Sequence, residues 1–428
     1  MNKKIVRQLS HYLELGGAIL LFIFSLSIVL PSPLPTLLNI ASYGILFLLI
    51  AARFKHFAYV ITRDKLLLLL VAFTVISVLW SVDEFVLDSA RGMIRTTMFG
   101  AYLATRYSSR EQIRLLCWVF SIAIALSLVA GALLPSYGAH VVNGVLSWRG
   151  VFEHKQGLGR LMSLAAPLFL INALEKRNRW LSLAGLGGAL ILLRLSNSAT
   201  GLLTFIFALS ILPFYVIVKQ NRYRLLPLAV GLLISCFAVI VVTLNIQTIV
   251  VDYLGKDMEF NGRTPIWNLV IKKGLEKPFF GYGYHGFWSS DAGDYVLART
   301  WLGDYDKPDS IADSGKKKAG GISHNGFLDL FVQLGFVGLT LFTLNLIMLS
   351  ARVFLLLFTT RSIEYFWIII FIGINLVTNI SDSLTILESN NIFWIVYVAV
   401  AMTSALELGR LRRKQKQIKY SENLTVTA

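Results

Sequence analysis

The chain has 428 residues, of which 56% are hydrophobic and only 15% are charged, and its formal net charge is +16 at pH 7. A soluble domain normally carries about 25% charged residues, so this composition excludes an ordinary globular or disordered protein. Because a helix that crosses a bilayer needs about 20 apolar residues, the apolar content is sufficient for about twelve spans. The composition therefore predicts an all-α polytopic membrane protein.

Apolar runs of spanning length recur along the whole chain, and we predict about twelve transmembrane helices from them. Two features leave ten or eleven spans with a re-entrant segment as an alternative: the fourth run contains Arg91 and Arg95, and the seventh and eighth runs nearly touch. The runs lie at about 15–31, 34–53, 65–81, 88–105, 112–135, 158–174, 180–195, 198–218, 225–246, 327–350, 363–380 and 391–409.

The basic residues are concentrated at the N-terminus, in every second connection and in the C-terminal tail, which together hold more than half of the 40 Lys and Arg residues. The intervening short connections are neutral or acidic, with Asp83, Glu84 and Glu388 as examples. Since positively charged connections stay in the cytoplasm, both termini are expected there. The positive charge is thus a topology signal, and no nucleic-acid partner is predicted.

Two segments on the outer side depart from this pattern of short connections. One covers about 136–160, and the other, about 247–326, is far longer than an ordinary connection and is therefore expected to be functional. Its residues 261–267 (NGRTPIW) resemble a turn that enters a helix, with Pro265 in the first turn and an end near Lys277 and Pro278. The glycine-rich run 281–286 is expected to be a loop, and 289–321 to be mobile.

The predicted organisation has four parts. They are an N-terminal transmembrane bundle with nine spans (1–246), a large outer loop domain (247–326), three C-terminal transmembrane helices (327–410) and a basic cytoplasmic tail (411–428).

The ionisable residues outside the basic connections gather at the outer ends of the spans and in the two outer segments, and the central spans are nearly free of charge. A transporter would carry such groups deep in its spans. The distribution therefore favours a reaction or binding site at the outer face. Arg91 and Arg95 lie one turn apart at an outer helix end, where we expect Asp88 to neutralise them.

The residues just before the tenth run form one candidate group. Directly after His324 come three polar residues that are four residues apart, Asn325, Asp329 and Gln333. They therefore share one helix face, which is expected to point into the protein. A helix cap followed by a stripe of interhelical hydrogen bonds is the alternative interpretation.

Two outer arginines, Arg149 and Arg263, are framed by Gly and Trp residues. The planar guanidinium group suits phosphate oxygens and keeps its charge at any working pH. The alternative for Arg263 is an ion pair with the acidic residues between 252 and 259. Three residues add positive charge beside Arg149: His154, Lys155 and Arg160.

No metal or cofactor site is predicted. The acidic run 304–309 has proline at its fifth position, no glycine at its sixth and no terminal glutamate, so it fails the EF-hand pattern. Cys117 and Cys236 both lie in apolar runs, which argues against a disulfide framework or a zinc site.

Four stretches together carry a family resemblance, since they occur here in family order: 148–155 (WRGVFEHK), 262–267 (GRTPIW), 281–283 (GYG) and 324–329 (HNGFLD). They resemble the O-antigen ligase/polymerase superfamily (the Wzy_C or WaaL-like proteins), and the chain is most similar to the ExoQ-like exopolysaccharide polymerases. The similarity covers roughly residues 75–410.

This resemblance implies a metal-independent, inverting glycosyltransferase with a GT-C-like membrane fold that needs no cofactor. It implies action at the periplasmic face of the bacterial inner membrane, on a glycan carried by undecaprenyl pyrophosphate. The acceptor is a second glycan in a polymerase, which we favour, or lipid A–core in an O-antigen ligase. Chain-length regulators and export proteins are the expected partners, and a transporter of lipid-linked glycan is the alternative from another class.

The resemblance also implies roles for individual residues. His324 is the expected base and Arg263 the expected catalytic cation on the pyrophosphate. The other pyrophosphate-binding candidates are Arg149, His154, Lys155 and Arg160. The substrate-binding candidates are Trp267, Tyr282, Tyr284 and Asn325, although packing explains the aromatic residues equally well.

Overall fold

The computed structural model describes residues 3–142, 144–174, 179–219, 263–304, 322–381 and 386–426. Each predicted apolar run within these ranges overlaps a helix, whereas the ninth run, 225–246, lies outside the described residues. The first half contains α1 (Lys3–Phe24), α2 (Leu34–Ala51), α3 (Phe54–Ile61), α4 (Lys65–Ile76), η1 (Ser77–Trp80), α5 (Val86–Arg106), α6 (Ser109–Leu133), α7 (Pro135–Gly138), β1 (Ala139–Val142), β2 (Val145–Trp148), α8 (Lys155–Leu174), α9 (Arg179–Leu195) and α10 (Ala199–Lys219). The second half contains α12 (Arg263–Gly274), α13 (Asp291–Leu297), η3 (Trp301–Asp304), α14 (Gly326–Thr360), α15 (Ile363–Ser381) and α16 (Ile392–Val426).

The apolar helices confirm an all-α membrane protein. Among the described residues, six helices are long and apolar enough to cross a membrane, namely α2, α6, α8, α14, α15 and α16. Three shorter apolar helices cover Tyr12–Phe24, Lys65–Trp80 and Ala199–Leu212. The count of twelve spans and the GT-C-like class stay predictions.

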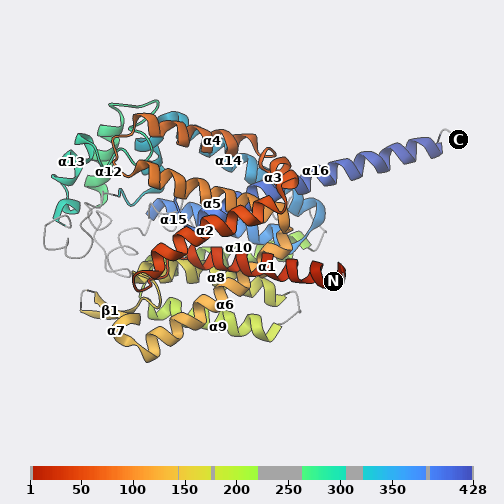
Figure 1. Ribbon diagram of the computed structural model, residues 1–428, viewed down its shortest axis with the longest axis horizontal. Coiled ribbons are helices and arrows are strands. Elements are labelled where there is room, and N and C mark those ends of the chain that lie inside the picture. The colour runs from red at the N-terminus through yellow and green to blue at the C-terminus, as the bar shows by residue number, and fades with distance from the viewer. Residues whose placement is uncertain are drawn as a thin grey trace.

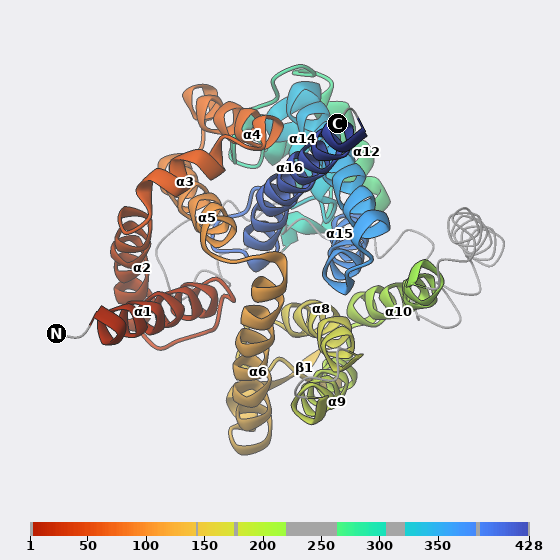
Figure 2. The ribbon, with the colours of Figure 1, turned by 90° about the vertical axis from the view of Figure 1, so that its right-hand side faces the viewer.

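The long helices run side by side, and Figure 1 shows both chain termini at one end of the molecule, with α12, α13 and the β1–β2 hairpin at the opposite end. The view in Figure 2 is turned by 90° and places α14, α15 and α16 together, with α6, α8 and α9 on another side. Termini at one common end agree with an even number of crossings. The side of the membrane on which they lie stays a prediction.

A buried polar network ties α4 to α14 and α16. The carboxylate of Asp64 accepts hydrogen bonds from the backbone of Leu67 (3.0 Å), from Asn345 Nδ2 (2.9 Å) and from Arg352. Tyr397 Oη donates to Asn345 Oδ1 at 2.6 Å. Because a buried charge is destabilising unless it is paired and hydrogen-bonded, these contacts fix how the helices register against one another.

The two arginines at the start of α5 behave differently from each other. Arg91 pairs with Asp88 at 3.2 Å on the surface, as expected. The prediction that Asp88 also neutralises Arg95 is wrong, because a separation of seven residues along a helix is about 10 Å. The guanidinium of Arg95 is instead buried and donates to neutral acceptors on α2 and in the segment 386–391: Asn39, Ser42 and Asn390.

The segment 278–283 lies directly on α14 at a kink in that helix. Gly335, at the kink, has φ +63°, and the amides of the two following residues donate to the carbonyls of Pro278 (2.7 Å) and Phe279 (3.1 Å). In return, the amide of Tyr282 donates to Val332 O at 2.9 Å. A Cβ atom at Gly335 would collide with the Phe279 carbonyl, so only glycine permits this approach.

The predicted outer loop has a small apolar core of its own within the described residues. Side chains of α12, α13, η3 and the loop between α12 and α13 pack against Phe331 and Val332 of α14. They are Ile266, Val270, Tyr282, Phe287, Trp288, Ala292, Val296 and Leu302. The described part of 289–321, the stretch that we predicted to be mobile, contains α13 and η3. The buried Val296 and Leu302 explain the ordered helices there.

Candidate active site at the α12–α14 junction

The first turn of α12 meets the segment that precedes α14. Arg263 is the first residue of α12, and Trp267 lies one turn later on the same face. The indole Nε1 of Trp267 donates a 2.8 Å hydrogen bond to the carbonyl of Ser323, the residue directly before His324. Two segments about 60 residues apart in the sequence are thereby brought into contact, and they contain the two residues with the leading predicted catalytic roles.

His324 has an unusual backbone conformation and a stacked ring. Its φ of +54° lies in the left-handed region, which is uncommon for a residue with a side chain. The residues on both sides hold it there, since the hydroxyl of Ser323 accepts from Asn325 N (3.1 Å) and donates to Asn325 O (2.9 Å). The half-buried imidazole stacks on the Trp301 indole, with centroids 5.8 Å apart and planes at 25°. The ring is thus kept in one orientation.

The polar face that begins α14 is a helix cap followed by a stripe of hydrogen bonds, which was the alternative that the sequence left open. Asn325 Oδ1 accepts from the amides of Phe327 (3.1 Å) and Leu328 (3.2 Å). Gln333 Oε1 accepts from the amide of His285 at 3.2 Å. These contacts account for the polar spacing, and sugar binding by Asn325 stays a prediction.

Asp329 is the buried centre of this stripe, with 4% of its surface exposed. Its carboxylate accepts from Trp288 Nε1 at 3.1 Å and from the amide of Ser323 at 3.2 Å. It therefore joins the outer loop and the backbone before His324 to one helix. The residue sets the position of the site through its neighbours.

Tyr282 and Tyr284 serve as packing residues in this structure. Tyr284 is 2% exposed, and its hydroxyl donates to the carbonyl of Leu387 at 2.7 Å. The hydroxyl of Tyr282 donates to the carbonyl of Lys273 at 3.0 Å, and its ring belongs to the outer apolar core. Both rings are covered by protein, which favours packing over sugar stacking; their role in substrate binding is untested.

Glu388 is a titratable residue of this region that the motifs did not single out. Burial, with the nearby carboxylate of Asp329 as a second cause, raises the pKa of Glu388 to about 7. Its segment is held by the Tyr284–Leu387 bond and by a 2.9 Å bond from Asn390 N to Thr96 Oγ1. The only sequence signal was an acidic residue in an otherwise short outer connection.

The second predicted group surrounds the β1–β2 hairpin. Arg149 Nε donates to the carbonyl oxygen of Tyr137 at 2.8 Å, and the guanidinium carbon of Arg149 lies 5.8 Å from the centre of the Tyr137 ring. Lys155 Nζ lies 3.5 Å from Ser147 Oγ, and the ring of His154 lies 5.2 Å from that of His140.

The hairpin group forms a positively charged patch. Burial lowers the pKa of His140, and the nearby charges of His154, Arg149 and Lys155 lower it further. Arg160 lies half-buried on α8 beyond these residues. A protein surface with this charge suits a phosphate-bearing ligand.

The structure therefore arranges the predicted residues as two groups. Figure 1 shows the α12–α13 region and the hairpin at the same end of the molecule but at separate places. The acidic residues 252–259, the alternative partners of Arg263, lie outside the described residues, as does the acidic run beyond Asp304. In the described ranges, no group of three or more His, Cys, Asp or Glu residues could hold a metal ion.

Comparison with known proteins confirms the family resemblance. Residues 184–343 match the family described as O-antigen ligase, a region that includes Arg263 and His324 but not the hairpin group. The exopolysaccharide production protein ExoQ of Rhizobium meliloti (strain 1021) is 26% identical over 230 residues. That alignment covers 52% of this chain and 50% of the relative, so the chain matches about half of the relative's length.

Proposed function

We propose that this chain is a glycosyltransferase of the bacterial inner membrane that polymerises or ligates polysaccharide. Its donor is an oligosaccharide on undecaprenyl pyrophosphate, which it uses at the periplasmic face, with both termini in the cytoplasm. The observation that carries the proposal is the hydrogen bond from Trp267 to Ser323, because it unites the Arg263 and His324 segments inside the matched region.

The chemistry is a single displacement at the anomeric carbon. The oxygen of the acceptor hydroxyl attacks that carbon and its proton passes to His324, while the bond to the pyrophosphate breaks and the leaving group takes the electron pair. A neutral imidazole is suited to this role near neutral pH. One displacement inverts the configuration of the sugar.

The leaving pyrophosphate gains negative charge in the transition state, and fixed cations in its path lower the barrier. Arg263 begins the helix that Trp267 joins to the segment before His324, and it supplies a guanidinium fork; no metal ion is needed for that role. The hairpin cations Arg149, His154, Lys155 and Arg160 would hold the donor's phosphates during approach.

Polymerisation is the favoured outcome, since the matched relative carries the name of an exopolysaccharide production protein. The matched family is described as O-antigen ligase, and this description supports ligation as the second candidate. The two differ only in the acceptor. Glycan transferred to lipid A–core would indicate ligation, and its absence there would indicate polymerisation.

The test is replacement of Arg263 or His324 by Ala in the native host. Loss of a general base or of a cation at the leaving group typically reduces the rate by 100-fold or more, so polymer should disappear and lipid-linked oligosaccharide should accumulate. Arg299→Ala is the matched control, because Arg299 is exposed in the same loop and lies over the ring of Tyr295. Full polymer yield in both variants, with normal membrane insertion, would contradict the assignment.

A chelator provides an independent test of the metal-free mechanism. Turnover in membranes treated with EDTA should equal that of untreated membranes. A loss of turnover that is reversed by added Mg²⁺ or Ca²⁺ would contradict metal independence. The roles of Arg263 and His324 would still be tested separately by the Ala variants.

A further inference from the structure

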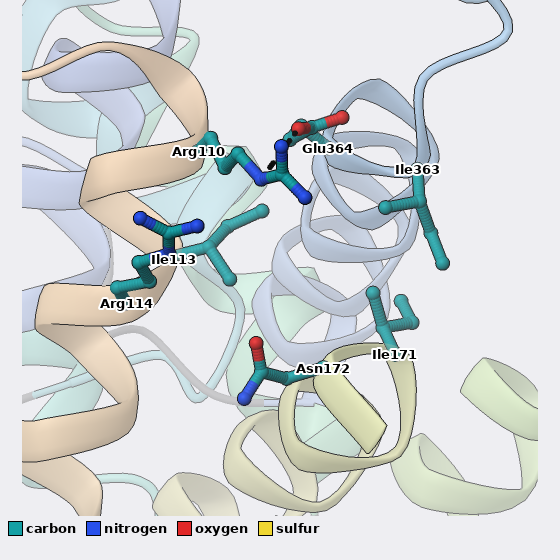
Figure 3. Close-up of a pocket in the computed structure, with 7 residues that line it drawn as sticks. All are labelled: Arg110, Ile113, Arg114, Ile171, Asn172, Ile363 and Glu364. Carbon is teal, nitrogen blue, oxygen red and sulfur yellow. Dashed lines mark ion pairs between the residues drawn. The ribbon is translucent and has the colours of Figure 1, made fainter. Parts of the chain in front are cut away.

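A recess opens between three helices at the end of the molecule where both termini lie. Its walls come from the first turns of α6 and α15 and the last turn of α8 (Figure 3). The candidate active site and the hairpin lie at the opposite end (Figure 1). The recess is therefore separate from the glycan-transfer site by the length of the helices.

The charges in the recess do not balance. Arg110 pairs with Glu364 at 3.5 Å, which neutralises the one carboxylate in the lining. Arg114, one turn further along α6, is half-buried; its charge acts on the carboxylate of Glu111 on the same helix, and it forms no ion pair within the lining. Figure 3 shows its guanidinium on the surface of α6 below that of Arg110, with the amide of Asn172 on another wall. The lining therefore holds two arginines and only one carboxylate.

The remaining walls are apolar, because α6, α8 and α15 contribute Ile113, Ile171 and Ile363. Arginines beside isoleucine side chains present a charged part and an apolar part to the same ligand. This combination matches an amphiphile with an anionic head. It does not match a soluble anion, which would gain nothing from the isoleucines.

The recess also lies at the level of lipid headgroups. Arg114 is five residues into α6, or about 7 Å along its axis, and the headgroup layer of a bilayer is about 5–8 Å thick on each side. Trp118, one turn deeper on the same face, is 56% exposed, and Trp180, at the start of α9, is 83% exposed. Exposed tryptophans are typical of the membrane–water interface.

We propose that this recess binds the headgroup of an anionic phospholipid from the leaflet at the end where the termini lie. The guanidinium of Arg114 binds the phosphate as a fork, and the acyl chains lie along the isoleucines and Trp118. The site is independent of the glycosyltransferase assignment, because its occupant belongs to the other leaflet.

Thermal unfolding of the purified full chain in detergent tests the proposal, with dioleoyl phosphatidylglycerol or dioleoyl phosphatidylcholine as the added lipid. A ligand that binds only the folded state raises the unfolding temperature in proportion to its occupancy. Phosphatidylglycerol should raise it more than phosphatidylcholine, and inorganic phosphate should leave it unchanged. Equal effects of the two lipids, or stabilisation by phosphate alone, would overturn the proposal.

Variants of Arg114 make the test specific. Arg114→Gln should weaken the apparent affinity for phosphatidylglycerol about tenfold, because a charge-assisted contact is lost, whereas Arg114→Lys should weaken it only a few-fold. Arg413→Gln removes the same charge from an exposed position of α16 at the same end and should bind as the unchanged protein does. An equal loss in Arg413→Gln, or none in Arg114→Gln, would show that only general surface charge attracts the lipid.

Discussion

The α12–α14 junction and the β1–β2 hairpin both carry predicted cations at the same end of the molecule, but they are built differently. At the junction, hydrogen bonds between residues distant in sequence fix the backbone before His324, through Trp267, Trp288 and the buried Asp329. At the hairpin, Arg149 is held by the carbonyls of Tyr137 and Glu153, which lie 12 and 4 residues away in the sequence, and it is partly exposed.

This difference separates two tasks that the sequence pattern had combined. A reacting base must be held in one orientation, which a cross-linked and partly buried junction achieves. A patch that attracts phosphates needs charge more than rigidity, and a hairpin at the surface supplies it. We therefore expect changes at the junction to affect stability and chemistry together, and changes at the hairpin to affect mainly binding of the donor.

The largest effect is expected from Asp329→Ala. The substitution leaves the indole N–H of Trp288 and the amide of Ser323 without their acceptor in a buried place, which should lower the free energy of unfolding by about 3–5 kcal/mol. Thermal unfolding of the purified protein measures it. Asp294→Ala, on the exposed side of α13, is the control. If both variants lowered the free energy of unfolding by similar amounts, the buried junction would be no more important for stability than the exposed side of α13.

The pH dependence of stability should reveal Glu388. Its pKa is raised from about 4.5 to about 7 in the folded protein, so the unfolded chain ionises this carboxyl at lower pH than the folded one does. Stability should therefore fall as pH rises from about 5 to 8, by about 3 kcal/mol from this residue. Glu388→Gln should flatten that part of the profile. An unchanged slope in Glu388→Gln would show that another group titrates.

Arg149→Ala should act at the hairpin through binding. We expect the KM for the lipid-linked donor to rise about tenfold, since one charge-assisted phosphate contact is lost, while kcat changes little. The unfolding temperature should stay nearly constant. A loss of stability with an unchanged KM would instead make Arg149 a structural residue of the hairpin.

Trp267→Phe gives the smallest and sharpest comparison. A six-membered aromatic ring is kept, but the five-membered ring of the indole is removed with its N–H. The bond to Ser323 O is therefore lost together with some packing, at a stability change of about 1–2 kcal/mol. Turnover should fall several-fold because the two segments are less firmly aligned. Trp180→Phe, exposed at the opposite end, should have no effect on turnover.

Much of the fold could be predicted from the sequence, because hydropathy and the spacing of basic residues report on the bilayer directly. The helices over 327–350 and 391–409 are long and apolar, and no other element type suits them. The start of α14 could also be predicted, because asparagine is a strongly preferred N-cap residue and Asn325 occupies that position.

The rest depends on tertiary contacts that leave little trace in sequence. Arg95 looks like a partner of Asp88, and only the approach of α2 and the 386–391 segment explains its burial. The glycine-rich run was recognisable as a loop. Its burial against the kink at Gly335, with Tyr284 in the main core, follows from packing between segments about 50 residues apart.

Transfer by the purified chain in lipid nanodiscs, with a synthetic polyprenyl-pyrophosphate oligosaccharide as both donor and acceptor, tests the central claim most directly. Mass spectrometry of the glycans and of the released polyprenyl pyrophosphate follows the reaction. We predict longer lipid-linked glycans and released carrier from the unchanged protein, and neither from His324→Ala. Equal transfer by His324→Ala would contradict the account.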